Sequence, residues 1–202
     1  MKLLFFDCET TGVPKDYKAS YEDVDNWPRV ISLAWLLCDC DGNVIHQQHE
    51  LIKPNGWQMP TEKFWIDNGF SHEKSVADGL PIEDVLEMFI ACKEQASALV
   101  AHNLSFDHRI VWAEIIRAGR EPKRGMEKYC TMMKSTSYCR LPAKRGFKWP
   151  KLEELYTVLF EKCFDNAHDA LADVIACKEC FFELVKRGVI HLSIQQPESE
   201  TV

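Results

Sequence analysis

Two acidic residues stand one residue apart near the start of the chain, in the stretch MKLLFFDCETTG. The apolar run Leu3–Phe6 before them is typical of a buried strand, and alternate residues of a strand point to the same face. Asp7 and Glu9 should therefore project from one face, with Cys8 on the other. Buried carboxylates are costly unless something holds their charge, and paired oxygen ligands suit hard divalent cations such as Mg²⁺ or Mn²⁺. A polar strand end that faces solvent is the alternative, and this pair alone does not decide between them.

A third acidic residue follows another apolar run, in ALVAHNLSFD. Asp107 lies in the first turn of a helix predicted over Ser105–Ala118, where the helix dipole favours a carboxylate. The strand ends of an open α/β sheet converge on one crevice. We therefore expect Asp107 to lie close to Asp7 and Glu9.

The stretch NAHDALADV supplies the last two candidates, His168 and Asp173. They are five residues apart, about 140° around a helix at ~100° per residue, so they do not share a helical face. We expect His168 at the entrance of the helix and Asp173 inside it, facing the site, while Asp169 caps the helix or faces solvent. Taken by itself, this motif favours a structural role for His168 over a catalytic one.

An α/β sheet is needed to bring these residues together, and the remaining sequence predicts one. Asp41-Gly42 indicates a hairpin between the second and third strands. Three strands in a meander, followed by strands that alternate with helices, predict a sheet of mixed direction. Residues 1–194 are expected to form one domain, with a polar tail over 195–202. The predicted strands are Leu3–Phe6, Val30–Cys40, Asn43–Lys53, Ala98–Ala101 and Met126–Thr131, and the main predicted helices are Pro81–Glu94, Ser105–Ala118, Leu152–Phe160 and Ala167–Lys186.

Charge is unevenly distributed along the chain, whose net charge is −7. Between Arg117 and Lys151 there are eleven basic and two acidic residues, so this band carries +9 and the rest of the chain −16. A basic band on an acidic body is expected to bind a polyanion. Tyr138, Phe147 and Trp149 lie within the band and are suited to stack on bases, which favours nucleic acid. The alternative is a solvated run of charges that binds nothing.

The nine cysteines do not have the arrangement of a zinc site. Cys38 and Cys40 fall in a predicted strand, and Cys177 and Cys180 in a predicted helix, whereas a zinc site usually draws four ligands from two such pairs. Free thiols in a reducing cytosol are the expected state. No apolar stretch is long enough to cross a membrane, and the first residues do not resemble a signal peptide. We therefore expect a cytoplasmic protein without membrane contact.

Taken together, these motifs resemble a known family. A D-x-E pair after the first strand, A-H-N-x-x-F-D after a later strand and H-x-x-x-x-D near a late helix resemble the DEDDh 3′→5′ exonucleases, the DnaQ-like or proofreading (DNA polymerase III epsilon) type of the ribonuclease H-like fold. The resemblance covers Lys2 to Lys186 and includes ETTG, CTM at Cys130–Met132 and WPKLEELY at Trp149–Tyr156. One departure is Asn68, which stands where many relatives carry the His of a His-Gly-Ile segment.

The resemblance implies a mixed five-stranded sheet flanked by helices and a hydrolytic, two-metal mechanism. Four carboxylates, those of Asp7, Glu9, Asp107 and Asp173, would bind two Mg²⁺ or Mn²⁺ ions. His168 would act as the general base toward the attacking water. Products would be nucleoside 5′-monophosphates. The 3′-terminal nucleotide would be bound by Thr10, Thr11, His102, Asn103 and Phe106.

The implied substrate is the 3′ end of single-stranded nucleic acid. DNA is favoured over RNA because the ETTG and WPKLEELY stretches are most similar to the proofreading group. An exoribonuclease that trims RNA 3′ ends remains an alternative. A non-catalytic nucleic-acid-binding module is another, but a decayed site should have lost at least one of the four carboxylates or His168, and this sequence retains all five. A role as the proofreading partner of a DNA polymerase is a further expectation. The segment after Gly188, which could bind such a partner, is short.

Overall fold

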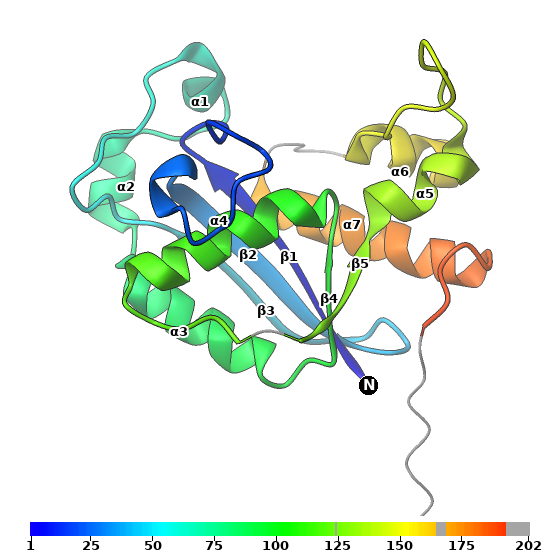
Figure 1. The fold of residues 1–202 in the computed structure, drawn as a ribbon, viewed down its shortest axis with the longest axis horizontal. Helices are drawn as coiled ribbons and strands as arrows, with labels where there is room; N and C mark the ends of the chain where they lie inside the picture. Colours follow the sequence, from blue (N-terminus) through cyan, green and yellow to red (C-terminus); the bar gives the residue numbers. More distant parts are fainter. Residues whose placement is uncertain (124, 165–168, 193–202) are drawn as a thin grey trace, which may run out of the picture.

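A five-stranded sheet forms the centre of the protein (Figure 1). The computed structural model describes residues 1–123, 125–164 and 169–192, so the expected tail over 195–202 lies outside the described part. The strand order is β3-β2-β1-β4-β5, with β1, β2 and β3 antiparallel in sequence and β4 and β5 parallel to β1. This arrangement confirms the predicted mixed sheet. The strands are β1 (Lys2–Thr10), β2 (Val30–Asp39), β3 (Val44–Leu51), β4 (Ala98–Ala101) and β5 (Glu127–Cys130).

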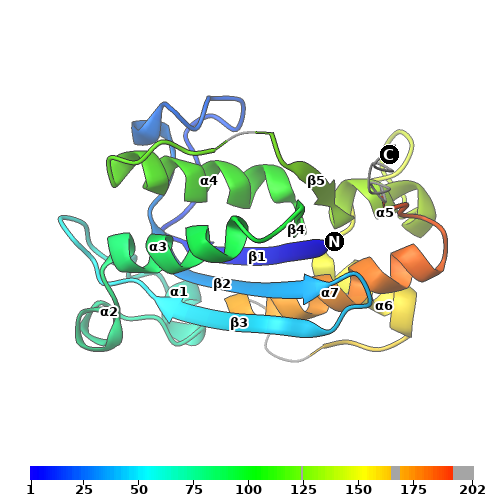
Figure 2. The ribbon, with the colours of Figure 1, turned by 90° about the horizontal axis from the view of Figure 1, so that it is seen from below.

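Helices cover both faces of the sheet (Figure 2). Helices α3 (Ile82–Lys93) and α4 (Leu104–Arg117) pack on one face, and α6 (Leu152–Phe160) and α7 (Ala170–Lys186) on the other. The alternation of β1 divides its apolar residues between two cores. Leu4 and Phe6 are buried beneath α3 and α4, while Leu3 and Phe5 are buried on the α6 and α7 side. The same alternation sends Asp7 and Glu9 toward α7.

A sharp reversal joins β4 to α4. Asn103 caps the helix in the left-handed conformation, with φ 63° and ψ 41°, a conformation that asparagine tolerates better than most residues. The helix then begins at Leu104 and places Asp107 in its first turn, as the sequence predicted. The short connection therefore fixes Asp107 within one helical turn of the strand end.

Several elements differ from the sequence prediction. The 3-10 helix Val24–Asn26 and the helices α1 (Lys63–Asp67), α2 (His72–Asp78) and α5 (Thr131–Cys139) were not expected. Strand β1 continues to Thr10, beyond the predicted Leu3–Phe6. Helix α7 begins at Ala170 rather than Ala167, because the Asp169 carboxylate caps it by accepting hydrogen bonds from Leu171 N and Ala172 N at 3.0 Å each. Residues 167 and 168 lie outside the described part.

The loop that joins β1 to β2 is tied to α4 by a buried ion-pair cluster. Glu114 is only 1% exposed, and its Oε1 lies 2.7 Å from Arg29 Nε and 3.0 Å from an Arg117 nitrogen. The same oxygen accepts a hydrogen bond from Val30 N at 3.2 Å. Next to this cluster, Thr11 N donates to the Arg29 carbonyl at 2.9 Å. The cluster thus holds the segment that continues from β1 beyond Glu9.

Candidate active site

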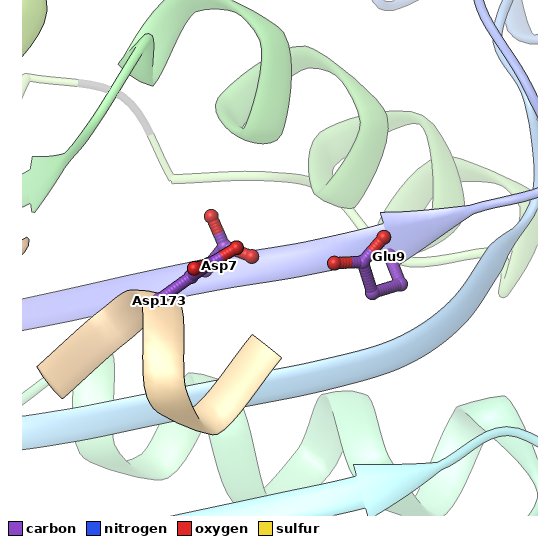
Figure 3. A group of neighbouring side chains, drawn as sticks. All are labelled: Asp7, Glu9 and Asp173. Atoms are coloured by element: carbon purple, nitrogen blue, oxygen red, sulfur yellow. The ribbon is translucent and has the colours of Figure 1, made fainter. Parts of the chain in front are cut away.

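Three carboxylates meet between β1 and α7 (Figure 3). Asp7 and Glu9 extend from β1, and Asp173 comes from the first turn of α7. One oxygen of each side chain lies within 4.8 Å of the others. The structure therefore brings together three of the four carboxylates that the sequence suggested as metal ligands, and Asp7 and Glu9 share a strand face as expected.

Loss of hydration and mutual repulsion dominate the electrostatics of this cluster. Loss of hydration is the main cause that raises the pKa of Asp7 well above its ordinary value, and the charge of Asp107 is the next. Loss of hydration also raises the pKa of Glu9 to about 8, followed by the charge of Asp173. None of the ion pairs found in the described ranges involves Asp7 or Glu9. Asp7 and Glu9, as neighbouring oxygen ligands without an ion pair to any described residue, fit a hard divalent cation.

Asp107 approaches from the opposite side of β1. Pairing of β4 with β1 ends at Phe5, so the Cys8 amide lies beyond the paired part of that edge. The Asp107 Oδ1 accepts hydrogen bonds from Cys8 N at 3.2 Å and from Cys8 Sγ at 3.3 Å. Asp107 is 3% exposed, and burial raises its pKa to about 7. Because its charge acts on Asp7, it belongs to the same electrostatic group, although it stands outside the three-carboxylate cluster.

A pocket of about 360 Å³ opens beside the cluster. Asp7 and Asp173 contribute the acidic wall, and the sequence-predicted His102 and Asn103 also line it. Sequence reasoning gave no role in this pocket to Met132, Pro150, Leu152 or Glu153, although all four lie in stretches that matched the family, CTM and WPKLEELY. The pocket is lined by Asp7, His102, Asn103, Met132, Trp149, Pro150, Lys151, Leu152, Glu153 and Asp173.

His102 connects two walls of the pocket. Its Nε2 lies 3.0 Å from the Pro150 carbonyl and its Nδ1 lies 2.9 Å from Thr131 Oγ1. Burial lowers the pKa of His102 to about 4, so the ring is neutral at neutral pH. A carbonyl oxygen only accepts, so the proton sits on Nε2 and Nδ1 accepts from the threonine hydroxyl. His102 therefore holds the start of α5 against the segment that enters α6.

The other predicted substrate-binding residues have different surroundings. Asn103 is half-buried, and its side chain makes no hydrogen bond to any residue that the structure describes. Phe106 is partly buried against the core beneath α3 and α4. The Thr10 hydroxyl donates to the Gly12 carbonyl at 2.7 Å, while Thr11 Oγ1 accepts from Arg29 N at 3.0 Å. These two hydroxyls thus shape the loop after β1, and neither residue lines the pocket.

Two further expectations concern His168 and Asn68. His168 lies outside the described residues, so its general-base role stays a prediction. Asn68 ends α1, where its Nδ2 donates to the Phe64 carbonyl at 2.8 Å. Its side chain is therefore engaged in closing the helix.

The predicted basic band divides into two parts. Near its start, Arg117, Arg120 and Lys123 are neutralised by ion pairs with Glu114, Glu87 and Glu94, respectively. In contrast, residues 142–149 are exposed throughout and form a loop closed by a bridge between Pro142 and Phe147. We call residues 140–151 the basic loop. Its Trp149 is 64% exposed and also lines the pocket, so this part of the band reaches the acidic cluster.

The cysteines and helices bear on two other expectations. All nine cysteines are free thiols. Across the described ranges, the one candidate metal-binding group is made of carboxylates and contains no cysteine. No helix in these ranges is long and apolar enough to span a membrane.

Comparison with known proteins places this geometry in a family. The RNase_T family model, described as Exonuclease, matches residues 4–181. Similar solved structures include Escherichia coli Exonuclease I with a dT13 oligonucleotide, at 20% identity and a TM-score of 0.70, covering 92% of this chain and 41% of that one. The zinc-bound complex of that enzyme with single-stranded DNA is also similar, at 20% identity and a TM-score of 0.69. The match covers 92% of this chain and 40% of that one.

A third solved structure gives the same picture. The moderately thermophilic Exonuclease I from Methylocaldum szegediense has 22% identity and a TM-score of 0.67, with 92% and 40% of the two chains covered. The chain thus spans about two fifths of the length of these enzymes, and the likeness shows a shared fold. No curated protein sequence matches the chain significantly. The narrower proofreading type stays a prediction. Because the family model spans all five strands almost completely and most of α7, the chain belongs to the exonuclease family of the DEDDh type.

Proposed function

We propose that the protein is a metal-dependent 3′→5′ exonuclease that acts on single-stranded DNA and releases nucleoside 5′-monophosphates. The observation that carries this proposal is the cluster of Asp7, Glu9 and Asp173, of which Asp7 and Asp173 line a pocket. Membership of the exonuclease family supports the reaction class. The structurally similar Exonuclease I molecules hold single-stranded DNA, which supports the substrate class.

Divalent cations, two Mg²⁺ or Mn²⁺ ions in this proposal, would be held by Asp7, Glu9 and Asp173, with Asp107 beside them. When bound, such ions stabilise the negative charge that builds up on the oxygens during phosphodiester hydrolysis. The raised pKa values of Asp7 and Glu9 fit this role, because a bound cation offsets the repulsion that causes part of the shift. The Cys8 hydrogen bonds hold the Asp107 carboxylate in place beside them.

Other residues of the chain would bind and orient the strand. The exposed ring of Trp149 is suited to stack on a base at the pocket mouth. Lys144 and Arg145 have no ion pair with any described residue and are available to phosphates. His102 keeps the walls of the pocket at a fixed separation, and His168, five residues before Asp173, would accept the proton of the attacking water.

The test is to incubate the purified protein with 3′-labelled single-stranded DNA or RNA in Mg²⁺, Mn²⁺ or EDTA. We expect metal-dependent release of 5′-mononucleotides from DNA. The Asp173→Asn variant should lose this activity, while Asp78→Asn, which changes an exposed acidic residue on α2, should keep it.

Other outcomes would replace the proposal. Faster degradation of RNA would identify an exoribonuclease, and binding without release in every metal would identify a binding module. A proofreading role beside a DNA polymerase would show as faster release from a mismatched 3′ end when the polymerase is present.

A further inference from the structure

A second pocket is lined by residues of α4, β5 and the loop that joins β1 to β2. Figure 2 shows α4 and this loop on the same side of the sheet. Its volume is about 430 Å³. A smaller hollow of about 160 Å³ adjoins it, since Tyr21, His108 and Lys128 line both. We call the two together the α4–β5 groove. The larger part alone has the size of pockets that hold small molecules.

The groove is positively charged in a chain whose net charge is −7. Arg109 and Lys128 supply this charge, while Lys123, which also lines the smaller hollow, is paired with Glu94. None of the described lining residues is an aspartate or glutamate. The neighbouring Glu127 does not cancel Lys128, because alternate residues of β5 face opposite sides of the sheet. Glu127 instead accepts a hydrogen bond of 2.6 Å from Tyr129, whose ring is buried on the α7 side. Such a groove selects an anionic ligand.

A histidine stacked on an aromatic ring also lines this groove. His108 is 9% exposed, and its ring nitrogens make no hydrogen bond to any residue in the described ranges. The ring stacks on Trp112, with centroids 4.0 Å apart and planes 20° apart, and meets the Tyr21 ring edge-on at 6.1 Å. The ring nitrogens are not fully enclosed by protein, so they can meet a ligand in the groove. A ligand that offers both an aromatic surface and hydrogen-bonding atoms would satisfy this wall.

The cations stand where they can meet a phosphate. The Arg109 guanidinium is held at the rim by a bond to the Tyr17 carbonyl and by the Trp27 ring, 5.7 Å away. This leaves other N–H groups of Arg109 available, since a guanidinium has five. Lys128 has no ion pair with the residues that the structure describes, and its ammonium is free to turn toward the groove.

We propose that the α4–β5 groove is a second nucleotide-binding site, with the phosphate on Lys128 and Arg109 and the base against His108 and Tyr21. Two sources have this chemistry: a free nucleoside 5′-monophosphate, or an upstream nucleotide of a strand whose 3′ end occupies the active-site pocket. The two pockets adjoin along the chain, because Asn103 and Met132 line the active-site pocket while their successors Leu104 and Met133 line the groove. The strand source rests on the proposed function, whereas the free-nucleotide source does not.

The test measures equilibrium binding in EDTA, where hydrolysis does not contribute, with dAMP and with oligo-dT of two to eight nucleotides as probes. Lys128→Gln should weaken binding about tenfold, the worth of one charge-assisted hydrogen bond. Lys162→Gln, which neutralises an exposed lysine outside both pockets, is the matched control and should bind like the wild type. His108→Phe keeps an aromatic ring against Trp112, removes the nitrogens, and should weaken the same probe.

The two kinds of probe distinguish a free nucleotide from an upstream nucleotide of a bound strand. Weaker binding of dAMP identifies a free nucleotide, and weaker binding confined to the longer oligonucleotides identifies an upstream unit of a strand. The proposal is overturned if Lys128→Gln binds every probe as Lys162→Gln does. A protein that binds through the groove yet never hydrolyses a strand would refute the proposed function alone, so the two failures are distinguishable.

Discussion

Without a divalent cation, the carboxylate cluster should make the protein less stable as the pH rises. A carboxyl group whose pKa is raised in the folded state holds its proton more tightly there than in the unfolded chain. Its favourable contribution is complete below the unfolded pKa and is lost as the pH rises through the folded pKa. For Glu9 this window runs from its ordinary value of 4.5 to about 8.

The size of the effect follows from this window. Each pH unit between the two pKa values is worth about 1.4 kcal/mol. As the pH rises from 4.5 to 8, Glu9 alone should therefore lower the free energy of unfolding by about 3–5 kcal/mol. For a chain of this length, that loss lowers the melting temperature by about 10 °C. The Glu9→Gln variant, which cannot ionise, should lose this part of the slope, while Asp7 and Asp107 retain theirs.

The assay is thermal unfolding from pH 5 to pH 9, in EDTA and in Mg²⁺, for the wild type and Glu9→Gln. The wild type in EDTA should be least stable at high pH, and Mg²⁺ should restore its melting temperature there because the ion binds the ionised carboxylates. Equal slopes for the two proteins in EDTA, or a wild type whose stability rises toward pH 9, would refute the reasoning.

Four other changes test separate parts of the structure. Asp7→Ala should abolish the rise in melting temperature on addition of Mg²⁺, as measured by titration of the ion during thermal unfolding. Lys144→Glu combined with Arg145→Glu should raise KM for single-stranded DNA and weaken its salt dependence with little change in kcat, and steady-state kinetics that show a fall in kcat alone would contradict a binding role. His168→Ala should slow mononucleotide release about 10²–10⁴-fold while strand binding persists, and a near-normal rate would make this residue structural. Glu114→Ala should lower the free energy of unfolding by about 3–5 kcal/mol in urea denaturation, because two arginines lose their buried partner.

Sequence patterns predicted the elements that carry an apolar face. Helix α6 has its predicted bounds, Leu152–Phe160, and α3 begins directly after Pro81, as expected for proline at a helix start. The helices that were missed lack this signal. Helix α1 buries none of its residues, and α5 buries only Thr131 and Ser135, so neither shows an apolar stripe.

The candidate site was predictable where the geometry is local. Strand alternation alone places Asp7 beside Glu9, and a short connection places Asp107 near the end of β4. The bonds of His102 were not predictable in this way, since its partners lie 29 and 48 residues further along the chain. Only the packing of α5 and α6 against the sheet brings those partners to the ring.

The double hydrogen bond of His102 has a mechanical consequence. The ring cannot rotate without breaking bonds to both Thr131 and Pro150, so the start of α5 and the entrance of α6 should move as one body. The basic loop is held more loosely between residues 142 and 149, which are exposed: a bridge between Pro142 and Phe147 closes the loop, and the side-chain tie to α6 is the solvent-exposed ion pair of Lys148 with Glu154. Loop motions run on nanosecond to microsecond timescales. Fast opening and closing of the pocket mouth is therefore expected in the basic loop, while the floor around His102 keeps its shape.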